Sequence, residues 1–176
     1  KCGYEYYLQT SKLYLSDTLY TTSQIDESLS LLDELITDPE TDEKVKLSAK
    51  VAYAFINAVE PKGNFEGTIK SYEDIIDGSG GFYMSRRDYW AWAYSLNAVG
   101  RKEEAKGLID QLAQEESVTT SYWQYMIAKS DNDLESALTH LEDYLEYNNV
   151  EVSDALKQSL ALSQRDYYES QAELSE

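Results

Sequence analysis

Apolar residues recur every three or four positions along most of this chain, the spacing that gives a helix one apolar face. Clusters of proline, glycine, serine or asparagine separate these segments and favour turns. No segment shows the sustained two-residue alternation that predicts a β-strand. Ser23 is expected to cap the second helix, and Pro39 to prevent it from continuing. The chain is therefore predicted to be all-α. The predicted helices cover residues 4–20, 24–37, 42–59, 65–77, 85–99, 102–115, 119–129 and 134–147, with a ninth from residue 153 to the end.

The second helix of each successive pair carries the same local pattern. A turn residue comes first, then acidic residues, a small residue, and apolar residues four and seven positions after the small one. The small residues lie 40, 37 and 32 residues apart, a variable period that indicates repeats whose loops differ in length. We therefore expect a repeated helical hairpin. The four small positions are Ser28, Thr68, Ala105 and Ala137.

The segment from Tyr89 to Leu112 resembles a tetratricopeptide repeat. The consensus of that repeat places W-x2-L-G-x2-Y on a first helix and A-x3-F on a second. Gly100 lies in the turn between the two helices, and the resemblance extends more weakly over residues 4–148. The residues that fill the consensus are Tyr89, Trp92, Ala93 and Leu96 on the first helix, and Ala105, Ile109 and Leu112 on the second. The resemblance implies a right-handed α-α superhelix of about four hairpins, at residues 4–37, 42–77, 85–115 and 119–147.

Two parts of the chain are expected, a repeat array at residues 1–152 and a terminal helix at 153–176. A stack of repeats leaves an apolar face at each end, and a terminal helix with a polar outer side covers it. Ala155, Leu156 and Leu160 would cover the last repeat, whereas the residues from 164 onward are mostly polar. We therefore expect the last helix to serve as a cap and as a connector.

Tetratricopeptide arrays usually bind their partners along the concave surface that the first helices line. The resemblance thus implies a site for a protein or a peptide on that surface. On the first helices of the third and fourth repeats, a stripe of residues lies opposite the consensus core positions. Arginine and aromatic residues, which binding hot spots favour, occur in this stripe. The alternative is that Trp90 and Tyr94 pack against the preceding repeat as ordinary core. The candidate partner-binding residues are Arg87, Trp90, Tyr94, Asn97, Tyr122 and Met126.

The charge of the chain narrows the choice of partners. A formal net charge of −18, from 33 acidic and 15 basic residues, repels phosphate backbones and anionic lipid headgroups. Nucleic-acid binding is therefore disfavoured, and membrane contact is expected only through segments outside this chain or a lipid anchor. The charge either keeps the protein soluble or steers a cationic partner toward a groove.

No pattern along the chain predicts catalysis. His140 is the single histidine, and Asp143, one helical turn further on, explains it as part of an exposed ion pair. Because the chain has no second histidine and no usable cysteine, a zinc site would need an all-carboxylate shell, which zinc does not prefer. Residues 131–142 match an EF-hand calcium loop at several ligand positions, but Ser136 stands where the sharp turn needs glycine. We expect neither enzyme activity nor a metal or other cofactor.

The first residues of the chain bear on its compartment. Cys2 is the single cysteine, so no intramolecular disulfide is expected. The thiol is either free or a lipid anchor, and Lys1, where a small residue is expected before an acylated cysteine, favours the free thiol. The missing initial Met and the absence of Asn-x-Ser/Thr sequons fit an exported bacterial fragment better than a cytoplasmic protein. The alternative function is therefore the sensing domain of a bacterial membrane-bound signalling or transcriptional regulator, which such degenerate repeats resemble.

Overall fold

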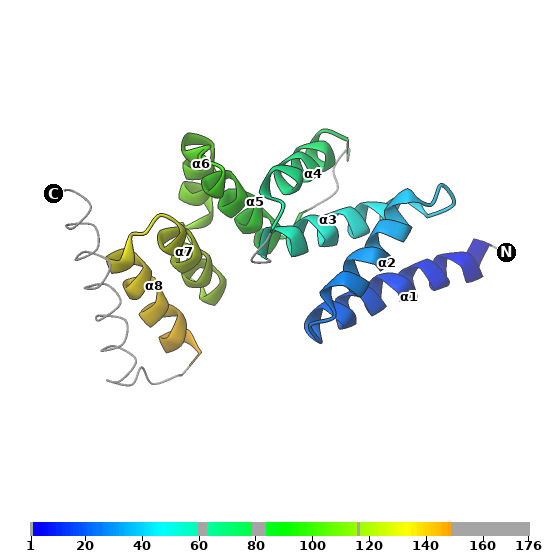
Figure 1. Ribbon diagram of the computed structural model, residues 1–176, viewed down its shortest axis with the longest axis horizontal. Helices are drawn as coiled ribbons and strands as arrows, with labels where there is room; N and C mark the ends of the chain where they lie inside the picture. Colours follow the sequence, from blue (N-terminus) through cyan, green and yellow to red (C-terminus); the bar gives the residue numbers. More distant parts are fainter. Residues whose placement is uncertain (1, 60–62, 79–83, 116, 149–176) are drawn as a thin grey trace. The chain divides into compact units, whose positions relative to one another are not determined.

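The computed structural model describes residues 2–59, 63–78, 84–115 and 117–148, and these ranges contain helices but no strand (Figure 1). The predicted all-α class is therefore confirmed for the described residues. None of the described helices combines the length and the apolar character that crossing a membrane would require. The helix predicted from residue 153 to the end lies outside the described ranges. The helices are α1 (Cys2–Thr21), α2 (Ile25–Thr37), α3 (Glu43–Val59), α4 (Phe65–Gly78), α5 (Arg86–Ala98), α6 (Lys102–Leu112), α7 (Val118–Ser130) and α8 (Leu134–Tyr147).

The turn between α1 and α2 differs from the prediction. Ser23 has a φ of 63°, and its backbone N–H donates to the carbonyl oxygen of Tyr20 at 3.0 Å. The N-cap residue of α2 is Gln24, whose side chain makes no capping hydrogen bond. The predicted Ser23 cap was wrong by one residue, because the tight turn requires a left-handed residue at that place and Ser23 supplies it.

The chain divides into two compact units, Lys1–Lys106 and Gly107–Glu176, and α6 spans the boundary between them. In the first unit each helix from α1 to α4 packs against the next, and the alternate helices α1, α3 and α5 also contact one another in order. In the second unit α7 packs against α8. Contacts between neighbours and between alternate helices are what stacked helical hairpins produce.

The four small positions of the predicted repeat are all buried. In the first unit two of them also form hydrogen bonds that close a hairpin. The hydroxyl of Ser28 on α2 donates to the carbonyl oxygen of Ser16 on α1 at 2.7 Å, and the hydroxyl of Thr68 on α4 donates to that of Ala54 on α3 at 3.2 Å. A small side chain at these positions lets the two helices of a hairpin approach closely.

Both ends of α5 are fixed by local interactions. At its start, the Ser85 side chain accepts from the backbone N–H of Asp88, and the Asp88 carboxylate accepts from the backbone N–H of Ser85 at 3.0 Å. After its end, Gly100 has a φ of 84°, which glycine adopts without strain. Arg101 then pairs with Glu73 of α4 at 3.0 Å. These contacts set the position of α5 and of Arg87 in its first turn.

Candidate binding groove

A groove in the first unit runs across α1, α3 and α5, the first helices of three successive hairpins. Its volume is about 230 Å³ and its lining is mostly apolar. Residues of α1 and α3 reach it because they recur at helical spacing, for example Ala52, Phe55 and Ile56 on one side of α3. The groove is lined by Leu13, Tyr14, Ser16, Asp17, Tyr20, Ser48, Ala52, Phe55, Ile56 and Arg87.

Arg87 is the part of α5 that reaches the groove. Its guanidinium carbon lies 3.9 Å from the centroid of the Phe55 ring, a cation–π contact that also keeps the arginine extended over α3. One guanidinium nitrogen lies 3.6 Å from the carboxylate of Asp88, which the capping interaction with Ser85 holds in place. The Tyr20 and Phe55 rings meet edge to face, with 6.3 Å between their centroids. The Arg87 side chain is still 53% exposed, so its remaining surface is open to a partner.

The four candidate residues of α5 differ in how far their side chains are exposed. Trp90 is 0% exposed and Asn97 is also buried, so neither side chain is presented to a partner. The expected exposed stripe is therefore wrong at these two positions, and burial of Trp90 agrees with the alternative interpretation as core. The physical reason is that α5 packs against both α3 and α4, which cover more than one of its faces. Tyr94 is half-buried, and its ring meets the Phe65 ring edge to face at 5.6 Å.

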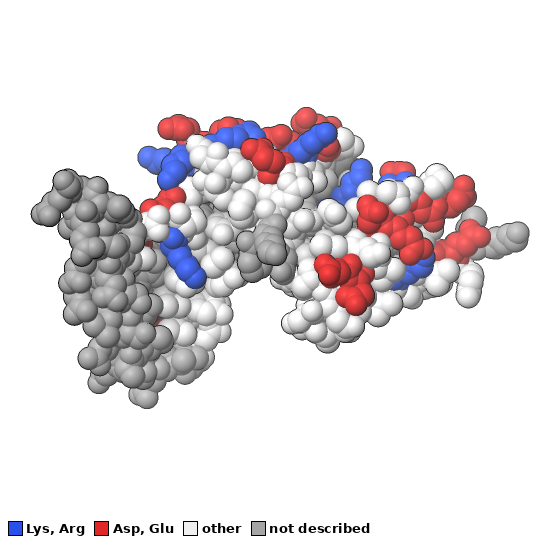
Figure 2. Space-filling view, viewed as in Figure 1, with Lys and Arg blue, Asp and Glu red and all other residues white. Residues whose placement is uncertain are grey.

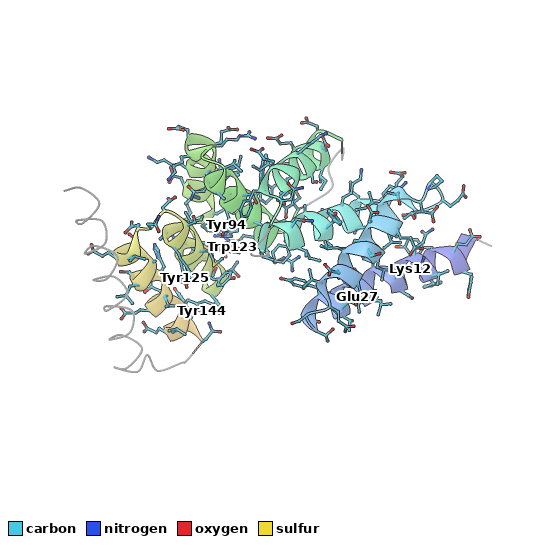
Figure 3. The ribbon with its side chains drawn as sticks, viewed as in Figure 1. Lys12, Glu27, Tyr94, Trp123, Tyr125 and Tyr144 are labelled. Atoms are coloured by element: carbon cyan, nitrogen blue, oxygen red, sulfur yellow. The ribbon has the colours of Figure 1, made fainter. Side chains whose placement is uncertain are left out.

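Tyr122 and Met126, the other two candidates, lie on α7 in the second unit and are half-buried. The Tyr122 ring is 5.5 Å from the Trp123 ring and 5.6 Å from the Tyr144 ring of α8. It therefore belongs to an aromatic cluster that joins the two helices; Trp123 and Tyr144 are labelled in Figure 3. A role of Tyr122 and Met126 in partner binding stays a prediction.

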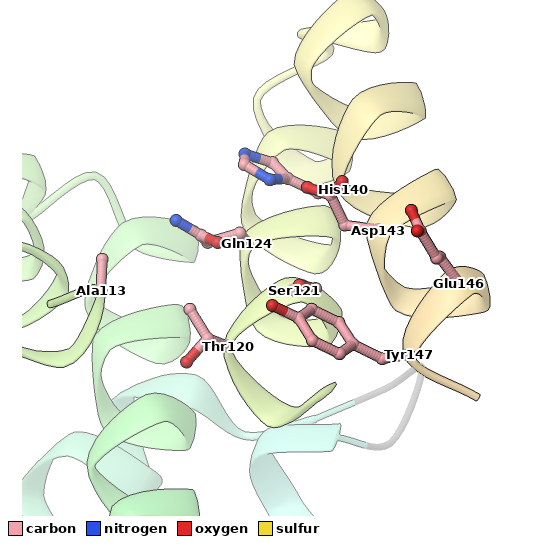
Figure 4. A pocket seen from close by; sticks show the side chains of 8 residues that line it. All are labelled: Ala113, Thr120, Ser121, Gln124, His140, Asp143, Glu146 and Tyr147. Atoms are coloured by element: carbon pink, nitrogen blue, oxygen red, sulfur yellow. The ribbon is translucent and has the colours of Figure 1, made fainter. Parts of the chain in front are cut away.

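The second unit has its own cavity, and its lining is polar (Figure 4). It has a volume of about 750 Å³ and lies beside α7 and α8. Figure 4 shows the Tyr147 ring pointing toward Ser121 and Thr120, with His140 on the side of Gln124. Although His140, Asp143 and Glu146 all line the cavity, the described residues include no group of three or more His, Cys, Asp or Glu side chains placed to hold a metal ion.

The groove residues of α1 and α3 were not among the sequence candidates. The signal that points to Tyr20 and Phe55 is the presence of aromatic residues on the first helices of the earlier hairpins, the same signal that marks α5 and α7. The α1 helix gives a weak signal, because apolar residues occur on more than one of its faces. Which of these faces turns toward α3 depends on the packing of whole hairpins, which the sequence pattern of one helix does not contain.

Acidic side chains cluster in the first unit, on a helix next to those that line the groove. Figure 2 shows them over α2 and the turn that follows it, and Glu27 of α2 is labelled in Figure 3. Lys12 of α1 pairs with Glu34 of α2, which neutralises one of these carboxylates. The first unit holds 18 acidic and 12 basic residues, a net charge of −6, so the field around it attracts cations.

Tyr72 on α4 is a buried polar group that serves packing. Its hydroxyl has no hydrogen-bond partner among the described residues, and its ring lies 6.4 Å from the Trp92 ring. Burial raises the pKa of the Tyr72 phenol well above its usual range, and the negative charge of Asp88 raises it further. This side chain therefore stays neutral in the folded protein and is unsuited to acid–base chemistry near neutral pH.

Comparison with known proteins finds no family model, no curated protein and no solved structure that matches this chain significantly. The resemblance to tetratricopeptide repeats therefore stays an expectation from the sequence.

Proposed function

We propose that this chain is a non-catalytic scaffold of tetratricopeptide type, which binds a segment of another protein in the groove across α1, α3 and α5. The observation that carries the proposal is the lining of that groove by the first helices of three successive hairpins, with apolar side chains predominating. Covering such a surface with apolar side chains of a partner yields about 25 cal/mol for each Å² removed from water. The groove therefore favours a partner that brings an apolar anchor.

The size of the groove supports a peptide over a cofactor. Its volume of about 230 Å³ is below the roughly 300–1,000 Å³ of pockets that enclose small-molecule ligands. One large aliphatic or aromatic side chain, with the backbone on either side lying along the surface, suits this space better. Arg87 at the edge can donate N–H groups to the carbonyl oxygens of such a backbone.

The charge of the chain supports a partner with basic residues beside its anchor. Asp17 lies in the lining of the groove, and the acidic surface of α2 is in the same unit. Charges of this kind speed the encounter with a cationic partner more than they tighten the final complex. The association rate should accordingly fall as ionic strength rises, because salt screens exposed charges.

A phage-displayed library of random peptides tests the proposal. Panning against the immobilised chain should enrich peptides with an aliphatic or aromatic residue flanked by lysine or arginine. Binding of one enriched peptide, labelled with a fluorophore, is then measured by anisotropy. Ser48→Arg on α3 places a bulky charge in the groove and should weaken binding at least tenfold.

The matched control is Ser30→Arg, which makes the same change at an exposed position of α2 outside the groove. This variant should bind the peptide within about twofold of the unchanged chain, since it adds the same charge without filling the groove. Circular dichroism and thermal melting establish that both variants fold. Equal binding by the two variants, or no enrichment of peptides above an unrelated acidic protein, would contradict the proposal.

A further inference from the structure

The outer side of α1 exposes a row of large apolar residues. Tyr4, Tyr7 and Tyr14 are 75%, 72% and 71% exposed, and Leu8 and Leu15 are 49% and 50% exposed. At about 100° per residue these five positions fall within an arc of about 120° on the helix surface. Monomeric proteins rarely leave so many large apolar side chains together in water.

This face of α1, defined by residues 4, 7, 8, 11, 14, 15 and 18, carries no charge. The two further members, Ser11 and Thr18, are small, exposed and neutral. Glu5, Lys12 and Asp17, the charged residues of α1, fall outside the arc. In a chain with a net charge of −18, an uncharged helix face is a place where two copies can approach without direct repulsion between side chains.

The residues of the face follow the spacing of paired helices. Positions 4, 11 and 18 alternate with positions 7 and 14 at steps of three and four, as along the seam of a coiled coil. In an antiparallel pair centred on residue 11, position 4 meets 18, 7 meets 15 and 8 meets 14. Each of these three contacts joins a tyrosine to a smaller residue, whereas a parallel pair would set Tyr7 against Tyr7 and Thr18 against Thr18.

We propose that this face of α1 binds the same face of a second copy of the chain, antiparallel, with Ser11 at the two-fold axis. Such an interface is self-complementary, because every contact between two different residues occurs twice. The small Ser11 allows the two helix backbones to approach at the axis. The tyrosine hydroxyls stay at the wet edges of the interface while the rings are covered.

The area of the face suits a dimer. Tyrosine rings this exposed, with two half-exposed leucines, present on the order of 600 Å² on each copy. The pair would then bury roughly 1,200 Å², the lower end of the range for specific interfaces. The face and the groove share Tyr14, so the test substitutes Ser11 and Thr18, which belong to the face and do not line the groove.

Cysteine cross-linking tests the pairing directly, in a background where Cys2 is replaced by serine. Ser11→Cys should form a disulfide-linked dimer under mild oxidation, because the two sulfurs would meet at the axis. Thr18→Cys is the matched control. It lies on the same face, and its hydroxyl, like that of Ser11, donates to the carbonyl oxygen four residues earlier. In the antiparallel pair its two copies stand about 20 Å apart along the axis, at 1.5 Å per residue, and should not link.

Light scattering during size-exclusion chromatography gives the second readout. The unchanged chain should approach twice its mass of 20.1 kDa as concentration rises. Tyr7→Glu should keep it at the single mass, because the added carboxylates would be buried against Leu15 of the other copy. A single mass at all concentrations, or cross-linking of Thr18→Cys as readily as Ser11→Cys, would overturn the proposal. So would a monomer that sediments with zwitterionic lipid vesicles through this face.

Discussion

The groove of the first unit and the cavity of the second differ in what lines them and in how the lining is supported. Mostly apolar side chains of α1 and α3 line the groove, and α5 contributes Arg87, which Phe55 and Asp88 hold in place. Polar and acidic side chains, mainly of α7 and α8, line the larger cavity. Water already solvates such a polar surface well, so covering it gains little, whereas covering the apolar groove is favourable. The larger cavity is thus the weaker candidate for recognition.

The largest expected effect is a difference between the two regions in how much one substitution lowers the free energy of unfolding. Trp90→Ala, in the helix that carries Arg87, should lower the free energy of unfolding by about 3–5 kcal/mol, because a fully buried large side chain is removed. Gln124→Ala in the wall of the cavity should change it by less than about 0.5 kcal/mol. Urea denaturation followed by tryptophan fluorescence and by circular dichroism measures both. Similar values for the two variants would break the distinction between a packed and a loosely supported site.

The next effect concerns binding of the peptide selected by panning. Phe55→Leu removes the ring that supports Arg87 and keeps an apolar side chain, so affinity should fall about tenfold. Arg87→Lys keeps the charge but loses the planar contact with the ring, and should weaken binding less. His140→Gln in the cavity is the control and should leave the affinity unchanged in an anisotropy titration. Weaker binding by the His140 variant would show that the peptide-binding site lies in the second unit.

A smaller effect compares the first turns of α5 and α7. Ser85→Ala should lower the free energy of unfolding by about 1–2 kcal/mol, because it removes a cap that is reinforced by the reciprocal hydrogen bond from the Ser85 N–H to the Asp88 carboxylate. Ser117→Ala removes a single cap, in which the Thr120 N–H donates to the serine oxygen at 3.2 Å, and should cost about 0.5–1 kcal/mol. Hydrogen exchange of the amides in each first turn locates the loss. Equal costs would show that the capping box adds nothing to α5.

The smallest effects are differences in pH dependence. Because burial raises the pKa of Tyr72 above its unfolded value of 10.0, its contribution to stability is complete below that value and is lost as pH rises above it. Tyr72→Phe should reduce this alkaline loss, at little cost near neutral pH, since the hydroxyl has no hydrogen-bond partner among the described residues.

In the second unit, hydrogen bonds from Ser136 lower the pKa of Asp133, the N-cap of α8. Its contribution is present above the unfolded pKa and is lost as pH falls through the lowered one. Asp133→Asn keeps the capping oxygen and should remove this acid dependence. Thermal melting across the pH range checks both variants, and an Asp133→Asn profile identical to that of the unchanged chain would contradict the second expectation.

Much of the fold could be predicted from local patterns. Helical spacing placed the eight described helices to within a few residues, and the small positions from Ser28 to Ala137 proved buried. Gly100 was expected in a turn, where its positive φ shows why glycine suits the place. These features depend on neighbours along the chain, which a single sequence displays.

The candidate site was harder to predict because it depends on packing between helices. A helical wheel places Trp90 opposite the consensus core, but it cannot show that α4 and α3 both cover α5. It likewise cannot show that Phe55, thirty-two positions before Arg87, comes to lie beneath the guanidinium. Such contacts are fixed by how hairpins stack, and no local spacing reports them.

The measurement that tests the central claim most directly is a nuclear magnetic resonance titration of the ¹⁵N-labelled chain with the selected peptide. The account predicts that the largest amide shift changes cluster on α1 between residues 13 and 20, on α3 between 48 and 56, and around Arg87. Changes centred on residues 120–147, or spread evenly over both units, would contradict it.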